Sequence, residues 1–203
     1  MEQIAYSSIP EWARPAAAGD RSPAGTPAPP AGGYGRTRIL VGIGPDGPRL
    51  AARWRAEFDP EGSATTVLFG VDRPHSAEVL RYALSRATVG VRLLLTGPPG
   101  DCLALRATAL SAGLCDDEIA VAPVGTGPVD VHCAHCRAVT PSECAVGDRV
   151  RCLGCGRDLV VYHHLSRRTG RFLGFQEDAE TARPADVDDP VLAAALTRKE
   201  PVR

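Results

Sequence analysis

The stretch VHCAHCRAVTPSECAVGDRVRCLGCG, residues 131–156, holds two Cys-x-x-Cys pairs and decides how the C-terminal part of the chain folds. Cys133 and Cys136 are separated by 15 residues from Cys152 and Cys155, a spacing typical of four-cysteine zinc sites. Each pair directs two thiolates toward one point, and two such turns on neighbouring hairpins complete a tetrahedron around Zn²⁺. Because thiolates fill all four positions, none is left for water or substrate, and the spacing predicts a structural zinc site.

Other interpretations of these cysteines stay open. Two disulfides, free core thiols or an iron site of rubredoxin type would use the same residues, although rubredoxin pairs are usually both followed by glycine. Here Arg137 follows the first pair and Gly156 the second. His132 and His135 could replace a cysteine ligand, but we interpret them as turn residues facing solvent or as donors to sulfur. The other three cysteines are interpreted as packing or spare thiols: Cys102, Cys115 and Cys144.

A mixed basic and aromatic segment follows the last cysteine. It reads DLVVYHHLSRRTGRFLGFQEDAE over residues 158–180, and Leu159–Tyr162 is predicted to be a strand. Such side chains suit nucleic acid, the phosphates or propionates of a redox cofactor, or a protein surface, and we favour a protein contact. The candidate contact residues are Tyr162, His163, His164, Arg167, Arg168, Phe172 and Phe175.

Upstream of the cysteines, residues 36–127 alternate strand-like and helix-like segments. Apolar runs predict strands at 38–43, 65–70, 91–96 and 119–122. Helices are predicted over 75–87, where apolar residues recur every three to four positions, and over 101–112. This alternation implies parallel strands joined by right-handed crossovers. We therefore predict the α/β class, a small parallel-sheet nucleotide-binding-like domain followed by a zinc-ribbon module.

The domain boundaries follow from composition. Residues 1–35 are rich in Pro, Ala and Gly and are predicted to be a flexible arm, in which Ile4, Tyr6, Ile9 and Trp12 could form a short docking segment. Residues 36–127 form the α/β domain, residues 128–180 the cysteine module, and residues 181–203 a tail with a possible short helix near 191–197.

Charge and cysteine content restrict the function classes. The 203 residues include 23 basic and 24 acidic side chains, a net charge of −1 that gives no global attraction to nucleic acid or anionic membranes. No apolar stretch is long enough for a membrane helix, and the first residues do not resemble a secretory signal. Seven cysteines, four of them in Cys-x-x-Cys pairs, indicate a reduced, metal-binding, cytoplasmic chain.

The α/β half contains a segment similar to one in ferredoxin reductases. Leu95–Asp101 reads LTGPPGD, precedes a predicted helix, and resembles the part of their nucleotide-binding domain in which a C-G-P-x-x motif contacts nicotinamide. That resemblance makes Gly97, Pro98 and Pro99 weak candidates for cofactor binding. Thr96 stands in place of the family's cysteine, and the Gly-x-Gly of residues 42–44 does not continue into a full phosphate-binding pattern. A scaffold that no longer binds nucleotide is the alternative.

The cysteine module has a more specific resemblance. VHCAHCRAVT, then RCLGCGRDLVVYHHLSRRTGRFLGFQEDAE, resembles the C-terminal module of the DmmA-type subunit of bacterial dimethylamine monooxygenase. The resemblance implies a subunit of a multisubunit, NADPH-driven oxygenase that converts dimethylamine to methylamine and formaldehyde. NAD(P) and flavin are then expected only in partner subunits. The chain lacks a flavin fingerprint, a ferredoxin cysteine set and a facial iron triad, so we expect a supporting role without catalysis of its own. Two small departures are Arg137 and Leu165.

A second hypothesis belongs to a different class. The chain could be a free-standing zinc-ribbon module that acts as an adaptor or binds nucleic acid. The near-neutral charge and the absence of a broad basic face count against nucleic acid. We therefore expect protein partners, namely the other subunits of the oxygenase, and neither nucleic acid nor membrane.

Overall fold

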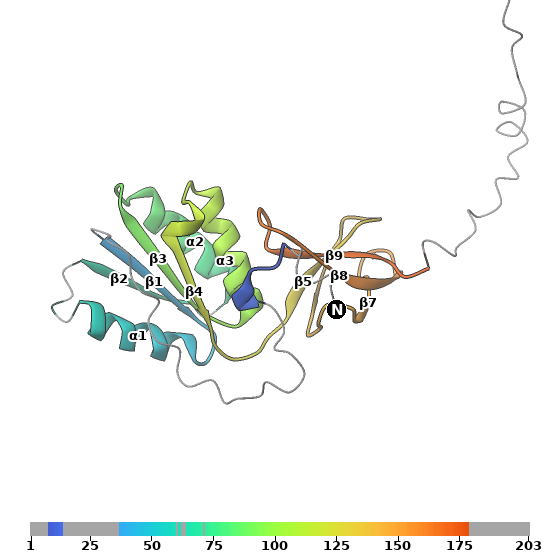
Figure 1. The fold of residues 1–203 in the computed structure, drawn as a ribbon, viewed down its shortest axis with the longest axis horizontal. Helices are drawn as coiled ribbons and strands as arrows, with labels where there is room; N and C mark the ends of the chain where they lie inside the picture. The colour runs from blue at the N-terminus through green and yellow to red at the C-terminus, as the bar shows by residue number, and fades with distance from the viewer. Residues whose placement is uncertain (1–7, 14–36, 60, 62–63, 71, 179–203) are drawn as a thin grey trace, which may run out of the picture.

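The computed structural model describes residues 8–13, 37–59, 61, 64–70 and 72–178. Two β-sheets lie next to each other, the first with helices on both faces and the second formed by the cysteine module (Figure 1). The α/β class and the order of parts are therefore confirmed. The possible docking residues Ile4 and Tyr6 and the tail at 181–203 lie outside the described residues.

All four strands of the first sheet are parallel, and their order is β2-β1-β3-β4. They lie close to the predicted positions: β1 (Thr37–Ile43), β2 (Thr65–Gly70), β3 (Val91–Gly97) and β4 (Ile119–Pro123). The central strands β1 and β3 are apolar on both faces, as expected for a parallel sheet covered on both sides. A short 3-10 helix, η3 (Asp116–Glu118), leads into β4.

Three helices cover this sheet. The helix α1 (Gly47–Phe58) packs Leu50 and Trp54 against one face, whereas α2 (Arg73–Ser85) and α3 (Pro99–Ser111) pack Leu80 and Leu105 against the other (Figure 1). The sequence analysis did not predict α1, and it began α2 and α3 two residues too late. Proline occupies the first turn of all three helices, where its missing N–H is not needed.

The second sheet has the order β6-β5-β9-β8-β7. Its strands are β5 (Val129–Cys133), β6 (Val139–Ser142), β7 (Arg149–Arg151), β8 (Asp158–Ser166) and β9 (Arg171–Gln176). The hairpins β5–β6 and β7–β8 are antiparallel, and β9 lies between them, parallel to β5 and antiparallel to β8. Strand β8 extends beyond the predicted Tyr162 to Ser166, with a register shift between Val161 and Leu165.

The cysteine module packs directly on α3. Leu103 of α3 belongs to the same buried cluster as Val131 and Leu165, and Gly170 in the β8–β9 turn lies so close that a Cβ there would be 2.5 Å from the Leu103 carbonyl oxygen. Arg73 of α2 adds ion pairs to Asp101 of α3 at 2.7 Å and to Asp130 of β5 at 2.8 Å.

Six residues of the predicted flexible arm have a defined place in the structure. Ile9 is 3% exposed in the core of the cysteine module, and the Ser8 hydroxyl both donates to the Leu165 carbonyl and accepts from the Leu165 N–H. Trp12, in the 3-10 helix η2 (Glu11–Ala13), packs against the cores of both sheets. The packing of Ile9 and Trp12 agrees with the short docking segment proposed for these residues, and through them residues 8–13 contact both cores.

Among the described residues, no helix combines the length and the apolar character that a membrane span requires.

Candidate metal centre

The two Cys-x-x-Cys turns have the same backbone geometry. In the first, the Arg137 N–H donates to the Cys133 carbonyl and the Cys133 N–H donates to the Ala138 carbonyl, both at 2.9 Å. In the second, Gly156 donates to Cys152 at 3.0 Å and Cys152 to Arg157 at 2.9 Å. The first turn lies between β5 and β6 and the second between β7 and β8, so each hairpin supplies two sulfurs.

The residue after each pair adopts a left-handed backbone. Arg137 has φ of +66° and Gly156 has φ of +68°. Glycine adopts this conformation without strain, whereas an L side chain crowds the following carbonyl. Arg137 is the sole described residue other than glycine with positive φ. Arg137 therefore adopts the same backbone conformation as Gly156, but with the strain that a side chain brings to it.

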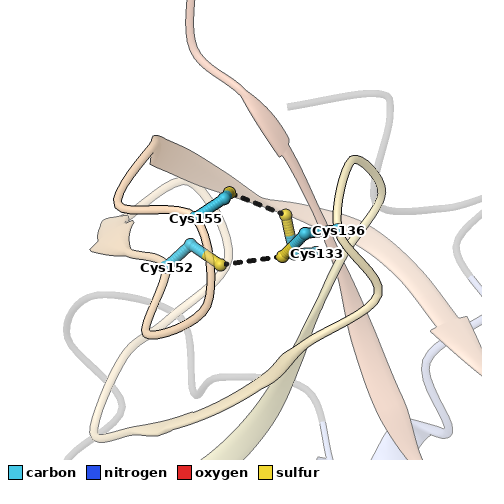
Figure 2. Close-up of side chains that lie close together, drawn as sticks. All are labelled: Cys133, Cys136, Cys152 and Cys155. Carbon is cyan, nitrogen blue, oxygen red and sulfur yellow. Dashed lines mark hydrogen bonds between the residues drawn. The ribbon is translucent and has the colours of Figure 1, made fainter.

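The four sulfurs converge on one point. The Sγ atoms of Cys133, Cys136, Cys152 and Cys155 all lie within 4.8 Å of one another (Figure 2). Cys133 and Cys155 are separated by 3.8 Å and Cys136 and Cys152 by 3.5 Å. A tetrahedral zinc with bonds of about 2.3 Å holds its sulfurs about 3.8 Å apart, whereas a disulfide requires about 2.05 Å. The arrangement fits one tetrahedral ion and does not fit two disulfides.

Neighbouring groups shift the pKa values of Cys152 and Cys136 in opposite directions. Backbone N–H groups of Cys155 and Gly154, together with the neighbouring thiols, lower the pKa of Cys152 to about 6. For Cys136 the Ala138 N–H acts in the same direction, but desolvation and the hydrogen bonds with the other three thiols outweigh it and raise the pKa to about 11. Across their 3.5 Å contact, either the Cys136 or the Cys152 sulfur can be the hydrogen-bond donor.

Two glycines allow the hairpins to approach each other. At Gly154, between Cys152 and Cys155, a Cβ would lie 2.5 Å from the Ala138 Cβ and 3.0 Å from the Cys136 sulfur. At Gly174 of β9, a Cβ would lie 2.6 Å from Val131 Cγ1. Strand β9 also links the first turn to the sheet, because the Gly174 carbonyl accepts from the Ala134 N–H at 2.9 Å. Sequence reasoning did not single out these glycines, and only the Cys-x-Gly-Cys pattern hinted at the first.

The other candidate ligands lie elsewhere. Within the described residues, no histidine and no further cysteine joins the four-sulfur cluster. His135 is exposed, as expected of a turn residue. Cys102 is buried in the core of the first sheet, where burial raises the pKa of its thiol and Sγ donates to the Gly97 carbonyl at 3.4 Å. Cys115 is exposed, and the half-buried Cys144 packs at the edge of the core.

Three of the predicted contact residues, Tyr162, His164 and Phe175, lie on one face of the second sheet, which we call the outer face, whereas Arg167 and Arg168 lie in the β8–β9 turn. Tyr162 and Phe175 meet edge to face at 5.4 Å on neighbouring strands, and the Tyr162 ring lies 3.9 Å from the His163 ring, tilted by 43°. His132 of β5 and His164 of β8 line a shared hollow of about 280 Å³ across β9. Tyr162, His164, Arg167 and Arg168 are exposed.

Phe172 does not belong to this outer face. It is 6% exposed and packs in the core of the module with Leu165 and Val131. Side chains alternate across a strand, so Phe172 and Gly174 point inward whereas their neighbours Leu173 and Phe175 point outward. The prediction of Phe172 as a contact residue is therefore wrong.

The weak nucleotide-binding candidates serve the packing of the first sheet. At Gly97, a Cβ would lie 2.5 Å from the Ile43 carbonyl oxygen, and at Gly44 it would lie 2.9 Å from the Pro98 ring. Pro99 begins α3, so the first turn lacks an N–H that a phosphate would need. Protein atoms thus occupy the space in front of these residues, which favours a scaffold over a nucleotide site.

Comparisons with known proteins find similarity that includes the cysteine module. Residues 130–175 match the C-terminal domain of dimethylamine monooxygenase subunit DmmA-like proteins. The chain is also 38% identical over 102 residues to the heme-dependent oxidative N-demethylase delta subunit of Ectopseudomonas mendocina (strain ymp). That alignment covers 50% of this chain and 57% of the relative, so the chain spans a little over half of the relative's length. No solved structure matches the chain. The resemblance seen in the cysteine pairs and the strand after them is confirmed, because the matched residues include all four cysteines and most of the segment that follows them.

Proposed function

We propose that this chain is a supporting, non-catalytic subunit of a multisubunit oxidative N-demethylase. Its substrate is dimethylamine, which the complex converts to methylamine and formaldehyde with electrons from NADPH. Haem, flavin and nicotinamide are held by other subunits. The proposal rests on the match of residues 130–175 and on the relative, which is named as the delta subunit of a heme-dependent oxidative N-demethylase.

The four cysteines hold a structural Zn²⁺ in this proposal. Four thiolates complete the coordination sphere, so the ion has no open position for substrate. Its role is to join the hairpins β5–β6 and β7–β8 on either side of β9. That arrangement supports the outer face, whose exposed Tyr162 and His164 are the proposed contact with a partner subunit.

Co-expression with the proteins encoded beside this chain tests the assignment. Dimethylamine-dependent NADPH oxidation and formaldehyde release should require this chain, and the purified complex should contain one zinc for each copy of it. The double variant Tyr162→Ala/His164→Ala should bind the other subunits more weakly than the wild type does. Tyr82→Ala removes an aromatic side chain from α2 that is 65% exposed, compared with 36% for Tyr162, and serves as the control.

Full activity without the chain would refute the proposal. A chain that stays alone and binds nucleic acid, with an affinity that falls steeply with salt, would instead favour the free-standing zinc-ribbon module.

A further inference from the structure

Arginine side chains gather at the junction of the two sheets, although the chain as a whole is nearly neutral. A hollow of about 420 Å³ lies between α2, α3 and the β8–β9 turn, and its floor consists mainly of alanines of α2 and α3. A second hollow of about 510 Å³ shares Ser111 and Arg168 with it. Together they form one open trough along α3. The arginines at the first hollow are Arg73, Arg81, Arg168 and Arg171.

Among the described residues, three of these four guanidinium groups have no ion-pair partner. Arg73 is already paired with Asp101 and Asp130. In the part of the chain that the structure describes, Arg81, Arg168 and Arg171 form no ion pair. Arg81 and Arg168 are exposed, so their guanidinium groups are accessible to a ligand in the trough.

The chemistry of the trough fits carboxylates. Guanidinium groups bind carboxylates through two parallel hydrogen bonds, and these charge-assisted bonds are among the stronger ones in proteins. Asp130 is the single carboxylate that lines the first hollow, and Arg73 already neutralises it. The trough is open and extends over two hollows, which suits an extended chain with several acidic side chains more than one compact anion.

The trough is also continuous with the outer face. Arg171 lines both the first hollow and the hollow that His132 and His164 share. A partner that covers Tyr162 and His164 could therefore contact the arginines of the trough through one continuous surface. We infer that the trough binds an Asp- and Glu-rich segment of the partner subunit, an inference that rests on the proposed function.

A labelled peptide tests the chemistry directly. Fluorescein-hexaglutamate should bind the zinc-loaded full chain, and its fluorescence anisotropy should fall as salt is added. Charge reversal in Arg81→Glu/Arg168→Glu should weaken binding by about tenfold or more, the equivalent of about 1.4 kcal/mol. Arg49→Glu/Arg55→Glu makes the same change on α1, on the opposite face of the first sheet, and should bind like the wild type. Zinc content and circular dichroism show whether each variant folds, and Arg168→Gln gives a milder loss if the double variant does not.

Other occupants of the trough would overturn the inference. Tighter binding of inorganic phosphate or of a DNA oligonucleotide than of hexaglutamate would do so. The variant Asp186→Asn/Asp188→Asn/Asp189→Asn gives a further test. If it binds the peptide more tightly than the wild type does, the chain's own acidic segment competes for the trough, and the inference is overturned.

The co-expressed complex separates this inference from the proposed function. If the charge-reversed chain joins the complex as well as the wild type does, the trough is not the docking site and the proposed function stands. If the wild-type chain joins no complex, both fall. We expect the wild type and the α1 control to assemble and the trough variant to dissociate at a lower salt concentration.

Discussion

Arg137→Gly should stabilise the cysteine module, because it relieves a strained backbone without removing a contact. Arg137 has φ of +66°, and its exposed side chain forms no ion pair with a described residue. The left-handed conformation costs an L residue about 1–2 kcal/mol. Glycine loses about 0.4–1 kcal/mol through the greater freedom of the unfolded chain. The difference is a net gain of about 0.8 kcal/mol, or about 2–3 °C in Tm for a chain of this size.

The second turn provides the reverse experiment. Gly156 has φ of +68°, and a Cβ there would be 3.6 Å from the nearest atom, Arg151 Nη2, an ordinary contact. Gly156→Ala should therefore lower Tm by about 2–3 °C, because the backbone strain exceeds what alanine gains by restricting the unfolded chain. The double variant Arg137→Gly/Gly156→Ala should melt close to the wild type. Melting is followed by circular dichroism at a fixed saturating zinc concentration, since bound zinc itself raises Tm. A lower Tm for Arg137→Gly would refute the equivalence of the two turns.

Three further predictions concern the metal and the junction of the sheets. Cys152→Ser should reduce zinc from about one ion per chain to a trace by elemental analysis, whereas Cys144→Ser should not. Zinc must displace the proton of Cys136, whose pKa is about 11. The displacement of this one proton should make zinc affinity rise about tenfold per pH unit near neutrality. Below about pH 6 the dependence should become steeper, because Cys152, with a pKa of about 6, is then protonated as well, and chelator competition measures both ranges. Arg73→Met leaves two largely buried aspartates without their partner, and urea denaturation should show a loss of about 2–3 kcal/mol.

The parts of the fold that local sequence patterns determine were predictable. The strands of the first sheet are short apolar runs, and the pairing of sulfurs follows from the spacing of the cysteines alone. The helix α1 was missed because Gly44-Pro45-Asp46-Gly47-Pro48 has the composition of a loop. Its apolar residues Leu50, Ala51 and Trp54 do recur at helical spacing, and Pro48 stands where a helix commonly begins.

Features that depend on distant contacts were not predictable. Ser8 bonds to Leu165, 157 residues later, and nothing near Ser8 indicates that partner. The end of β8 was placed too early because the polar His163 and His164 end the apolar and aromatic run of residues 159–162 that indicates a strand. The trough likewise combines arginines from α2 and from the β8–β9 turn, which only the packed structure brings together.

The position of β9 has a consequence for the order in which the module is made. It is the last strand of the second sheet to leave the ribosome, yet it occupies the middle of that sheet. Until it emerges, the hairpins β5–β6 and β7–β8 have no strand between them, and their cysteine pairs are held together only by the intervening loop. Closing such long-range contacts is slow compared with forming a hairpin. For the metal ion proposed at these cysteines, we therefore expect stable capture only after residue 176, and we expect a nascent chain stalled before β9 to leave its four thiols open to oxidation.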